Sequence, residues 1–427
     1  MDVPATAALA WDGLGEQAAL AWDGLGEQAA LAWDGLGEHS GFVLRRAEVL
    51  QVELAMREPV RTARSTHRRR PVVLVHVVGE VDGRPAEGWG ECAALADRTY
   101  DREDVSVAFA LVGGRLLAAL VEACGPGRLL PAAGGLGTVR AAASASPLSY
   151  AAVEAAVGDA HLRAEERSFA ALLGVEGTSV SVGAVVGTAG DLDELVGRVG
   201  RLVGQGYGRV KMKIGPGSDA GPVRAVREAF PGLRLQVDAN ESYTEAEGDA
   251  LAALDGAGLD CIEQPFDRRD LGAHARLARR MRTPICLDES LTSPEAVSEA
   301  LAAGACSVVC LKPARLGGIA AAIEVIRRCA DAGVPVWIGG MYETVFARGV
   351  NAVLAALAGP DWPGDLAPPD TYLLGDPWSG TRAAGLWGVD RSGALTVATG
   401  SEPGLGPLPV RSALESVVTR RSGIDAR

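Results

Sequence analysis

Five stretches of the chain decide its fold, and they read GRVKMK (208–213), LRLQVDAN (233–240), LDCIEQP (259–265), TPICLDES (283–290) and CSVVCLKP (306–313). Each is a short run rich in Val, Ile, Leu or Cys that ends in polar residues, and a helical pattern follows each one. Such nearly continuous apolar runs are typical of strands that are buried on both faces of a parallel sheet. The repeated strand–helix order therefore predicts an α/β protein built on parallel strands.

The same alternation continues on both sides of these five stretches. Residues 180–186 (VSVGAVV) and 334–340 (VPVWIGG) are two further expected strands, and 364–374 (GDLAPPDTYLL) is expected to supply an eighth. Helical patterns fill the intervals, and they include 191–204, 219–229, 270–281, 317–332 and 343–358. Seven or eight successive strand–helix units predict a (β/α) barrel of the TIM type over residues 176–395.

Charged residues end the five strands at a nearly constant spacing. They are 25, 25, 25 and 24 residues apart, and they are Lys213, Asp238, Glu263, Asp288 and Lys312. One strand–helix unit per step places each side chain at the carboxyl end of the next barrel strand, which is the rim where the active sites of such barrels lie. The sequence therefore predicts that three carboxylates and two amines converge on one mouth.

The three carboxylates indicate a bound cation. Carboxylates at close range repel one another strongly unless a cation joins them. All the donors are hard oxygens without His or Cys, and Mg²⁺ prefers such ligands while it keeps positions for water and substrate. Asp238, Glu263 and Asp288 are therefore the predicted metal ligands, with Mg²⁺ as the expected ion and Mn²⁺ as an alternative.

Only three lysines occur among 41 Lys and Arg residues, and all three lie in these strands. Arg does not lose its proton in a protein, whereas a buried Lys can be tuned to act as a base. Lys213 and Lys312 are predicted to face each other across the metal and to handle the proton of a carbon next to a substrate carboxylate. Lys211 shares a strand face with Lys213, so it is expected to contact the carboxylate, to lower the pKa of Lys213, or to be a structural charge.

An 11-residue unit, AALAWDGLGEQ, occurs three times in tandem over residues 7–39, with His in place of the last Gln in the third copy. Two glycines in each copy oppose a helix, and eleven residues are too few for a solenoid repeat. Residues 1–40 are therefore interpreted as a repetitive, disordered extension without a catalytic role. An interaction arm that displays Trp is the alternative.

Residues 41–175 carry a different pattern, in which strands come first and helices follow. The predictions are strands at 41–54 and 71–80, a basic loop at 57–70, a turn at 88–92, helices at 105–123 and 149–173, and a loose loop at 125–146. Strands followed by helices predict a small α+β domain.

Composition excludes several classes of function. The 427 residues carry a net charge of −13, and binding to nucleic acid needs a basic surface, so no nucleic-acid partner is expected. No apolar run approaches the length of a membrane span, so no membrane partner is expected. Seven scattered cysteines without a C-x-x-C pair indicate a reducing, cytoplasmic setting and no zinc site. The expected partner is a small carboxylate molecule, and a homo-oligomer is compatible with the sequence.

The strand ends KMK, VDANESY, IEQPF, CLDES and LKPARLGG resemble the muconate-lactonising subgroup of the enolase superfamily. Within that subgroup, GWGECAAL and AGVPVWIGGMYET are most similar to o-succinylbenzoate synthases and N-succinylamino acid racemases. The resemblance extends over residues 41–407. It implies that the barrel is covered by a capping domain, which is built from residues 41–175 and from a C-terminal segment, 396–427, that returns to it and ends in a flexible tail.

The resemblance also implies roles for individual residues. Lys213 would be the base that removes the α-proton, and Lys312 would stabilise the enolate by a charge–π contact or act as the base on the opposite face. A lysine base beside Mg²⁺ is an established pattern of this superfamily. Loop 57–70 would close over the substrate. The other implied site residues are those that orient ligands and lysines, Asn240 and Glu289, and those that line the succinyl side of the substrate, Gly339, Gly340 and Met341.

Two enzyme activities follow from the resemblance as expectations. The first is the Mg²⁺-dependent dehydration of a cyclohexadiene carboxylate to o-succinylbenzoate, which is a carbon–oxygen lyase reaction of menaquinone biosynthesis. The alternative is the racemisation of N-succinylamino acids or other N-acylamino acids, or another isomerisation like that of muconate cycloisomerase. A non-catalytic barrel that binds a metabolite is a third hypothesis, and it predicts the loss of at least one strand-end residue, whereas all five are present.

Overall fold

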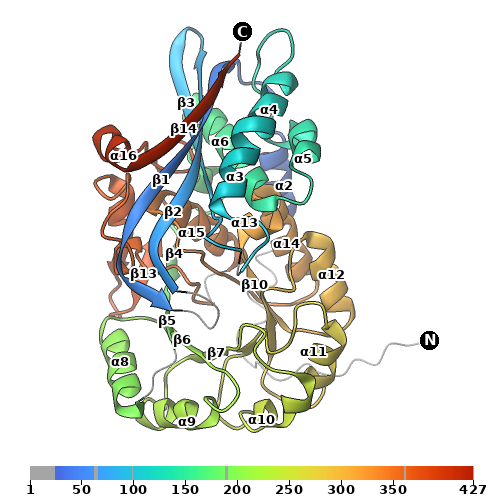
Figure 1. The fold of residues 1–427 in the computed structure, drawn as a ribbon, viewed down its shortest axis with the longest axis vertical. Helices are drawn as coiled ribbons and strands as arrows, with labels where there is room; N and C mark the ends of the chain where they lie inside the picture. Colours follow the sequence, from blue (N-terminus) through green and yellow to red (C-terminus); the bar gives the residue numbers. More distant parts are fainter. Residues whose placement is uncertain (1–24, 62–65, 99, 188–190, 360–361, 427) are drawn as a thin grey trace, which may run out of the picture.

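A computed structural model describes residues 25–61, 66–98, 100–187, 191–359 and 362–426. The chain folds into a curled sheet of parallel strands, surrounded by helices, and a second part with an antiparallel sheet that lies above it in Figure 1. The predicted α/β barrel with an α+β capping domain is therefore confirmed.

Seven parallel strands form the barrel sheet, in the order β11-β10-β9-β8-β7-β6-β5. Neighbouring strand ends are in register, because Lys213 pairs with Asp238 and Asp238 pairs with Glu263. Aligned strand ends bring the charged side chains to one rim of the barrel. The strands are β5 (Gly183–Val186), β6 (Arg209–Lys213), β7 (Leu235–Asp238), β8 (Ile262–Glu263), β9 (Ile285–Leu287), β10 (Val308–Leu311) and β11 (Val336–Ile338).

The prediction of an eighth strand at 364–374 is wrong, because within the described residues only Gly364 and Asp365 of this segment form backbone hydrogen bonds with the barrel strands. The Gly183 N–H donates to the Gly364 carbonyl at 2.7 Å, and the Asp365 N–H donates to the Ile338 carbonyl at 2.9 Å. Gly364 and Asp365 thus bridge β5 and β11 and close the ring. Two prolines follow at 368 and 369, and proline has no N–H for a strand ladder. A 3₁₀ turn, η4 (Pro369–Thr371), forms there instead.

Helices on the outer face of the barrel connect its strands (Figure 1). The Ser293 hydroxyl accepts from the Ala296 N–H at 3.2 Å, and Pro294 occupies the first turn, where a helix needs no N–H. These helices and turns are α8 (Leu192–Gly204), α9 (Ala220–Ala229), η3 (Glu245–Glu247), α10 (Gly248–Ala252), α11 (Leu271–Ala278), α12 (Pro294–Ala302), α13 (Pro313–Leu316), α14 (Ile319–Asp331) and α15 (Val345–Ala358).

The capping sheet has four antiparallel strands in the order β14-β1-β2-β3. Strands β1 and β2 form one long hairpin in which Ala55 pairs with Arg69, so the predicted loop 57–70 is wrong for its described part. The expected turn at 88–92 belongs to strand β3, where Gly88 and Gly90 have no side chains and let a helix approach the sheet closely. The strands are β1 (Val43–Arg61), β2 (Thr66–Val81), β3 (Arg84–Cys92) and β14 (Val418–Asp425).

Helices of the capping domain pack against this sheet. The expected loose loop at 125–146 is wrong in part, because a 3₁₀ turn and a helix form within it, and the helix expected at 149–173 is divided in two. The elements are α3 (Val105–Leu111), the π-turn η1 (Val112–Leu116), α4 (Leu117–Ala123), η2 (Ala133–Gly135), α5 (Gly137–Ala143), α6 (Pro147–Ala164) and α7 (Phe169–Leu172).

Among the described residues, one continuous helical stretch, Val105–Ala123, is long and apolar enough to cross a membrane. The expectation that no apolar run reaches this length is therefore wrong. In this structure 44% of the most apolar window is buried, and Val112, Leu116 and Leu120 lie fully buried in the apolar core of the capping domain. The composition of this stretch thus follows from its place inside a packed domain.

The third copy of the 11-residue unit is ordered. Residues Leu25–Asp34 form helix α2, and Trp33 at its end is completely buried. The prediction of a disordered extension is wrong for residues 25–40, because tertiary packing of Trp33 offsets the low helix propensity of the glycines. Residues 1–24 lie outside the described residues.

The C-terminal segment contributes to both parts of the molecule. Strand β13 pairs with β4 and β12 beside the barrel, whereas β14 pairs with β1 of the capping sheet, with Leu50 opposite Arg421. The expectation of a flexible tail is therefore wrong for residues 418–425, which are held in a sheet. The remaining elements are β4 (Ser179–Ser181), η5 (Arg382–Leu386), β12 (Trp387–Val389), β13 (Leu395–Ala398) and α16 (Arg411–Val417).

Candidate active site

Three carboxylates lie where strands β7, β8 and β9 end. Asp238, Glu263 and Asp288 have exposed fractions of 1%, 0% and 1%. The structure thus brings the three predicted metal ligands to neighbouring positions on one rim, where water cannot solvate their charges. Buried carboxylates need a compensating charge, so the arrangement calls for cations.

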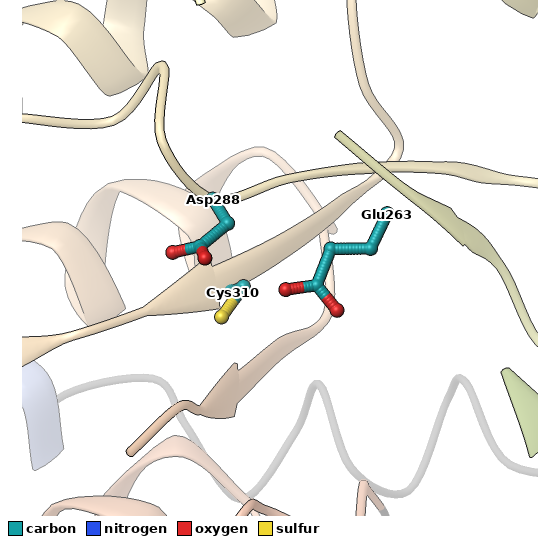
Figure 2. A group of neighbouring side chains, drawn as sticks. All are labelled: Glu263, Asp288 and Cys310. Carbon is teal, nitrogen blue, oxygen red and sulfur yellow. The ribbon is translucent and has the colours of Figure 1, made fainter. Parts of the chain in front are cut away.

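Figure 2 shows Glu263 and Asp288 with a third side chain, Cys310 of β10. One ligand atom from each of these residues lies within 4.8 Å of the others. Asp238 is outside this group, and its Oδ2 lies 2.5 Å from Lys213 Nζ. Burial holds the pKa of the Cys310 thiol well above its usual range, and a protonated thiol is a poor ligand for a hard cation. The carboxylates are therefore the donors that matter here.

The surrounding charges divide the carboxylates into two kinds. Burial raises the pKa of Glu263 to about 8, and the neighbouring Asp238 adds to the effect. Burial also favours the protonated form of Asp288, but the Arg315 guanidinium and the Lys312 ammonium outweigh it and hold the pKa of Asp288 below its usual range. The rim therefore contains one carboxylate with a raised pKa, Glu263, beside two whose pKa is lowered, Asp238 and Asp288.

Lys213 approaches the carboxylates from the β6 side. Its Nζ donates to Asp238 Oδ2 at 2.5 Å and to Asn240 Oδ1 at 2.7 Å. Burial lowers the pKa of Lys213 and Lys211 nearby adds to this effect, but Asp238 and Glu263 together leave that pKa raised. Asn240 Nδ2 donates in turn to Glu289 Oε1 at 3.0 Å, so a chain of hydrogen bonds fixes the position of the Lys213 amine.

Lys312 approaches the carboxylates from the β10 side. Its Nζ donates to Asp288 Oδ2 at 2.8 Å and also to the hydroxyl of Tyr100, whose ring centre lies 4.7 Å from the amine. Arg315, one turn of helix α13 further on, contacts both Asp288 and Tyr100. Because β7, β8 and β9 lie between β6 and β10, Lys213 and Lys312 border the carboxylates from two sides.

Lys211 lies deeper in the barrel than Lys213 and is 3% exposed. Its Nζ is 2.7 Å from Asp365 Oδ2 and 3.0 Å from Glu263 Oε2, and it lies 4.7 Å above the centre of the Trp337 ring. These contacts place Lys211 under the carboxylates, as a fixed positive charge that partly offsets theirs.

A further buried carboxylate lies next to the ligand group. Glu289 is 2% exposed, and no hydrogen-bond partner lies near its Oε2 within the described part of the chain. Burial raises the pKa of Glu289 to about 7, and the charges of Asp288 and Asp238 contribute. A rim with three buried hard-oxygen ligands and an unsatisfied carboxylate oxygen beside them fits a divalent cation of the Mg²⁺ type.

The three residues after strand β11 have different neighbours. A side chain at Gly339 would collide with Cys310 Sγ and Lys312 Cε, each 2.8 Å from the position of its Cβ. A side chain at Gly340 would meet the Arg348 guanidinium. Met341 is 4% exposed, and it lines a cavity together with Lys312 and with Glu91 of the capping domain. Of the predicted substrate-side residues, Gly339 and Met341 therefore lie beside Lys312, and Met341 shares a cavity with it.

Three residues of this site were missed in the sequence. Tyr100 follows strand β3 of the capping domain, and no pattern marks it. Arg315 lies three residues after Lys312, and that spacing places it one helical turn further on if a helix begins directly at the strand end. Asp365 lies within the segment that was expected to form a strand, and an aspartate at the start of that segment was a signal that could have been used.

Comparisons with known proteins agree with this geometry. Residues 194–408 match the family described as enolase C-terminal domain-like. The chain is 40% identical over 386 residues to an N-succinylamino acid racemase of Amycolatopsis sp, covering 90% of this chain and 98% of the relative. It is 36% identical over 323 residues to an o-succinylbenzoate synthase of Geobacillus kaustophilus, covering 76% of this chain and 84% of the relative.

Solved structures share the fold. A member of the enolase superfamily from Listeria innocua has a TM-score of 0.82 at 29% identity, with 90% of this chain and 100% of that chain covered. A dipeptide epimerase from Cytophaga hutchinsonii, solved with Mg and the dipeptide D-Ala-L-Val, has a TM-score of 0.76 at 19% identity, with 90% and 100% covered.

Proposed function

The chain belongs to the enolase superfamily, and from this premise we propose that it removes the proton next to the carboxylate of a small substrate, with Mg²⁺ as its cofactor. The observation that carries the proposal is the placement of Lys213 and Lys312 on two sides of three buried carboxylates. A site of this kind can hold a substrate carboxylate and reach the neighbouring carbon from either side.

Asp238, Glu263 and Asp288 would hold the cation, and Mn²⁺ is an alternative ion with the same preference for oxygen. When bound there, Mg²⁺ supplies positive charge that stabilises the negative charge developing on a substrate carboxylate as its α-proton leaves. Asn240 and Glu289 would orient the ligands and the Lys213 amine, because they form one hydrogen-bonded chain with it.

Lys213 would act as the base. A lysine works as a base only when its amine is neutral, and the pairing with Asp238 opposes that state. Lys211 favours the neutral amine, since its charge lowers the pKa of Lys213. The proton taken from the substrate would be held on Lys213 Nζ, where Asp238 Oδ2 and Asn240 Oδ1 accept hydrogen bonds from the ammonium.

Dehydration of a cyclohexadiene carboxylate to o-succinylbenzoate is the first candidate reaction. Lys213 alone would serve it, first as base and then as the acid that protonates the leaving hydroxide on the same face. Lys312 would remain an ammonium, held by Asp288 and Tyr100, and would stabilise the enolate from the opposite face. The similarity to o-succinylbenzoate synthases at 36% identity supports this carbon–oxygen lyase activity of menaquinone biosynthesis.

Racemisation of N-succinylamino acids is the second candidate, and a specific observation favours it. The relative that shares 40% identity over 90% of this chain is an N-succinylamino acid racemase. In this isomerase reaction Lys213 and Lys312 would exchange roles, one removing the α-proton and the other returning a proton on the opposite face. The succinyl group would lie near Gly339, Gly340 and Met341 in either reaction.

One assay separates the candidates. Purified protein with MgCl₂ is given the cyclohexadiene carboxylate in one experiment and an N-succinylamino acid in D₂O in another, and both are followed by ¹H NMR. Dehydration without α-deuteration supports the synthase, and α-deuteration with loss of optical activity supports the racemase. If the protein binds both compounds without turnover of either, the proposed function is wrong and a non-catalytic binding role replaces it.

The proposal also covers the cellular environment and the partners of the protein. The seven cysteines are all free and buried, which supports a reducing, cytoplasmic environment. A small-molecule carboxylate is the proposed partner, and a homo-oligomer remains compatible with the chain.

A further inference from the structure

The third copy of the AALAWDGLGEQ unit occupies a groove with a defined shape. Helix α2 contacts α14 and α7, and the ring of Trp33 lies 5.5 Å from that of Phe169. Trp33 Nε1 donates to Glu154 Oε1 at 3.4 Å. A side chain at Gly158 of helix α6 would overlap the indole ring, so the groove has room for Trp33 only because residue 158 is glycine. We call this groove between α6, α7 and α14 the Trp groove.

The contacts with the Trp groove come from positions that are identical in all three copies. Ala29, Trp33 and Leu36 are 2%, 0% and 3% exposed, and they are the first, fifth and eighth residues of their copy. Gly37, the ninth residue, has φ +93° and lies against the ring of His161. The one position that differs is the eleventh, His39, which is exposed. Within the unit, these contacts thus come from residues that all three copies share, and the contact of Ser40 with His161, which lies outside the unit, is specific to the third copy.

The second copy also reproduces the flanking residues. Residues 14–27 read LGEQAALAWDGLGE, and residues 25–38 read the same. The match includes the first turn of helix α2, which begins at Leu25. The first copy lacks this match, since VPAT precedes it at 3–6 in place of LGEQ.

We propose that the Trp groove is a docking site for the 11-residue unit and that residues 14–27 occupy it in a minor population of molecules, in place of residues 25–38. In that register Trp22 fills the position of Trp33. The displaced residues lengthen the connection to β1, which begins at Val43, by one repeat of eleven residues. Loop-closure scaling lowers the population of this register by roughly tenfold. The contact between Ser40 and His161 is also lost and lowers it further.

Disulfide trapping tests the proposal in the full-length chain. A Cβ at Gly26 would lie 3.5 Å from the Cβ of Arg327, which is within reach of a disulfide. The pair Gly26→Cys with Arg327→Cys therefore reports the observed register. Gly15 is the equivalent of Gly26 in the second copy, so Gly15→Cys with Arg327→Cys reports the proposed register.

The expected result is an intramolecular disulfide in both pairs, forming at least about tenfold more slowly in the Gly15 pair. Adding Trp33→Ala should make the Gly15 pair the faster of the two. Arg327→Cys alone is the control, because the seven native cysteines are buried. Absence of the Gly15 disulfide under both conditions would overturn the proposal, and so would a disulfide between two molecules, since the occupant would then be a second chain.

Thermal unfolding is an independent test of whether the second copy can replace the third in the Trp groove. Replacing a buried Trp with Ala in a core is among the most destabilising changes. Trp33→Ala should nevertheless lower the melting temperature only slightly, and Trp22→Ala not at all, whereas Trp22→Ala with Trp33→Ala should lower it by several degrees more than the two single changes together. Additive shifts, or a Trp33→Ala chain that does not fold, would mean that the second copy cannot replace the third.

Discussion

Lys211 and Asp365 form an ion pair of 2.7 Å inside the barrel, between the second strand and the two residues that close the ring. Asp365 also accepts a hydrogen bond from Arg209 at 2.8 Å. Both cations are almost completely buried, with side chains 3% and 1% exposed. One aspartate thus joins two buried cations to the point where the barrel closes.

Replacing Asp365 with Asn should destabilise the protein by about 3 kcal/mol, because the buried side chains of Lys211 and Arg209 both lose a carboxylate partner. Urea unfolding monitored by circular dichroism measures this difference. Asp370→Asn is the matched control, since Asp370 is exposed on the same segment. Equal effects of the two substitutions would mean that the Lys211 pair contributes nothing to stability.

Lys213→Ala should lower turnover by at least about 10²-fold, the contribution typical of a general base, while it leaves Mg²⁺ binding intact. Lys312→Ala distinguishes the two candidate reactions. In a racemase each variant should lose α-proton exchange with one enantiomer only. In a synthase Lys312→Ala should reduce dehydration without changing which face is exchanged. Activity that survives Lys213→Ala would show that another group is the base.

Glu263→Gln should have opposite effects on the metal-free and the metal-bound protein. The pKa of Glu263 is raised from 4.5 to about 8, so the folded state holds this proton more tightly than the unfolded state does. Stability therefore falls as the pH rises from 4.5 through 8, and Gln should remove that fall. The same change removes a proposed ligand, so the rise in melting temperature on adding Mg²⁺ should disappear.

Chelation is the control for the Glu263→Gln prediction. In the unchanged protein, Mg²⁺ at about 100 times its dissociation constant should stabilise by about 2.7 kcal/mol, and EDTA should reverse the gain. A variant that keeps the full Mg²⁺ response would show that Glu263 is not a ligand.

His76 should make the folded protein less stable as the pH rises, because its pKa is raised in the folded state. It lies between Glu48 at 2.9 Å and Glu87 at 2.7 Å, and its ring stacks on Trp89 at 3.9 Å. Burial lowers the pKa of His76, but the two glutamates outweigh it and leave that pKa above 6.5. The charged triad therefore stabilises the fold fully below pH 6.5, and the effect is lost as the pH rises through the folded-state pKa.

Melting temperatures of the unchanged protein and of His76→Gln, measured from pH 5 to 9, test this. The difference between them should be largest at low pH and should shrink as the pH rises. His39→Gln provides the control, since His39 is exposed and its replacement should leave the melting temperature close to that of the unchanged protein. A His76→Gln difference that grows with pH would contradict the assignment of a charged imidazole.

Cys310→Ser should change Mg²⁺ affinity by less than about twofold, although the thiol lies within 4.8 Å of two proposed ligands (Figure 2). The raised pKa keeps the thiol protonated, and Mg²⁺ prefers hard oxygen donors. Isothermal titration of both proteins with MgCl₂ measures the affinity. A tenfold loss of affinity in the serine variant would place sulfur among the ligands.

The barrel and its rim of charges could be predicted because each strand, with the charged residue at its end, is visible in a short stretch of sequence. A strand–helix unit of about 25 residues repeats, and each repeat brings Asp238, Glu263 or Asp288 to the same edge. Register between strands then follows from the barrel itself. Lys213 and Lys312 lie on two sides of the carboxylates because of the order of the strands, so their positions can be predicted without knowledge of side-chain packing.

The rest of the site depends on contacts between distant segments. Tyr100 reaches Lys312 only because the capping domain packs on the barrel, and no local pattern encodes that contact. The sequence predicts a strand at Asp365, but the prolines after it end the backbone pairing. The glycines around Trp33 predict no helix there, yet the burial of Trp33 depends on the space left by Gly158, 125 positions further on. At Trp33, tertiary packing therefore overrides local propensity.

The pairing of β1 with β14 sets an order of events during biosynthesis. Gln51 and Thr419 are hydrogen-bonded across 368 positions of sequence, so the edge of β1 emerges from the ribosome long before its partner strand exists. Domains usually begin to fold from the N-terminal side as the chain is made. An unpaired strand edge is a template for aggregation, so nascent chains of this protein should depend on chaperones until the last strand is released.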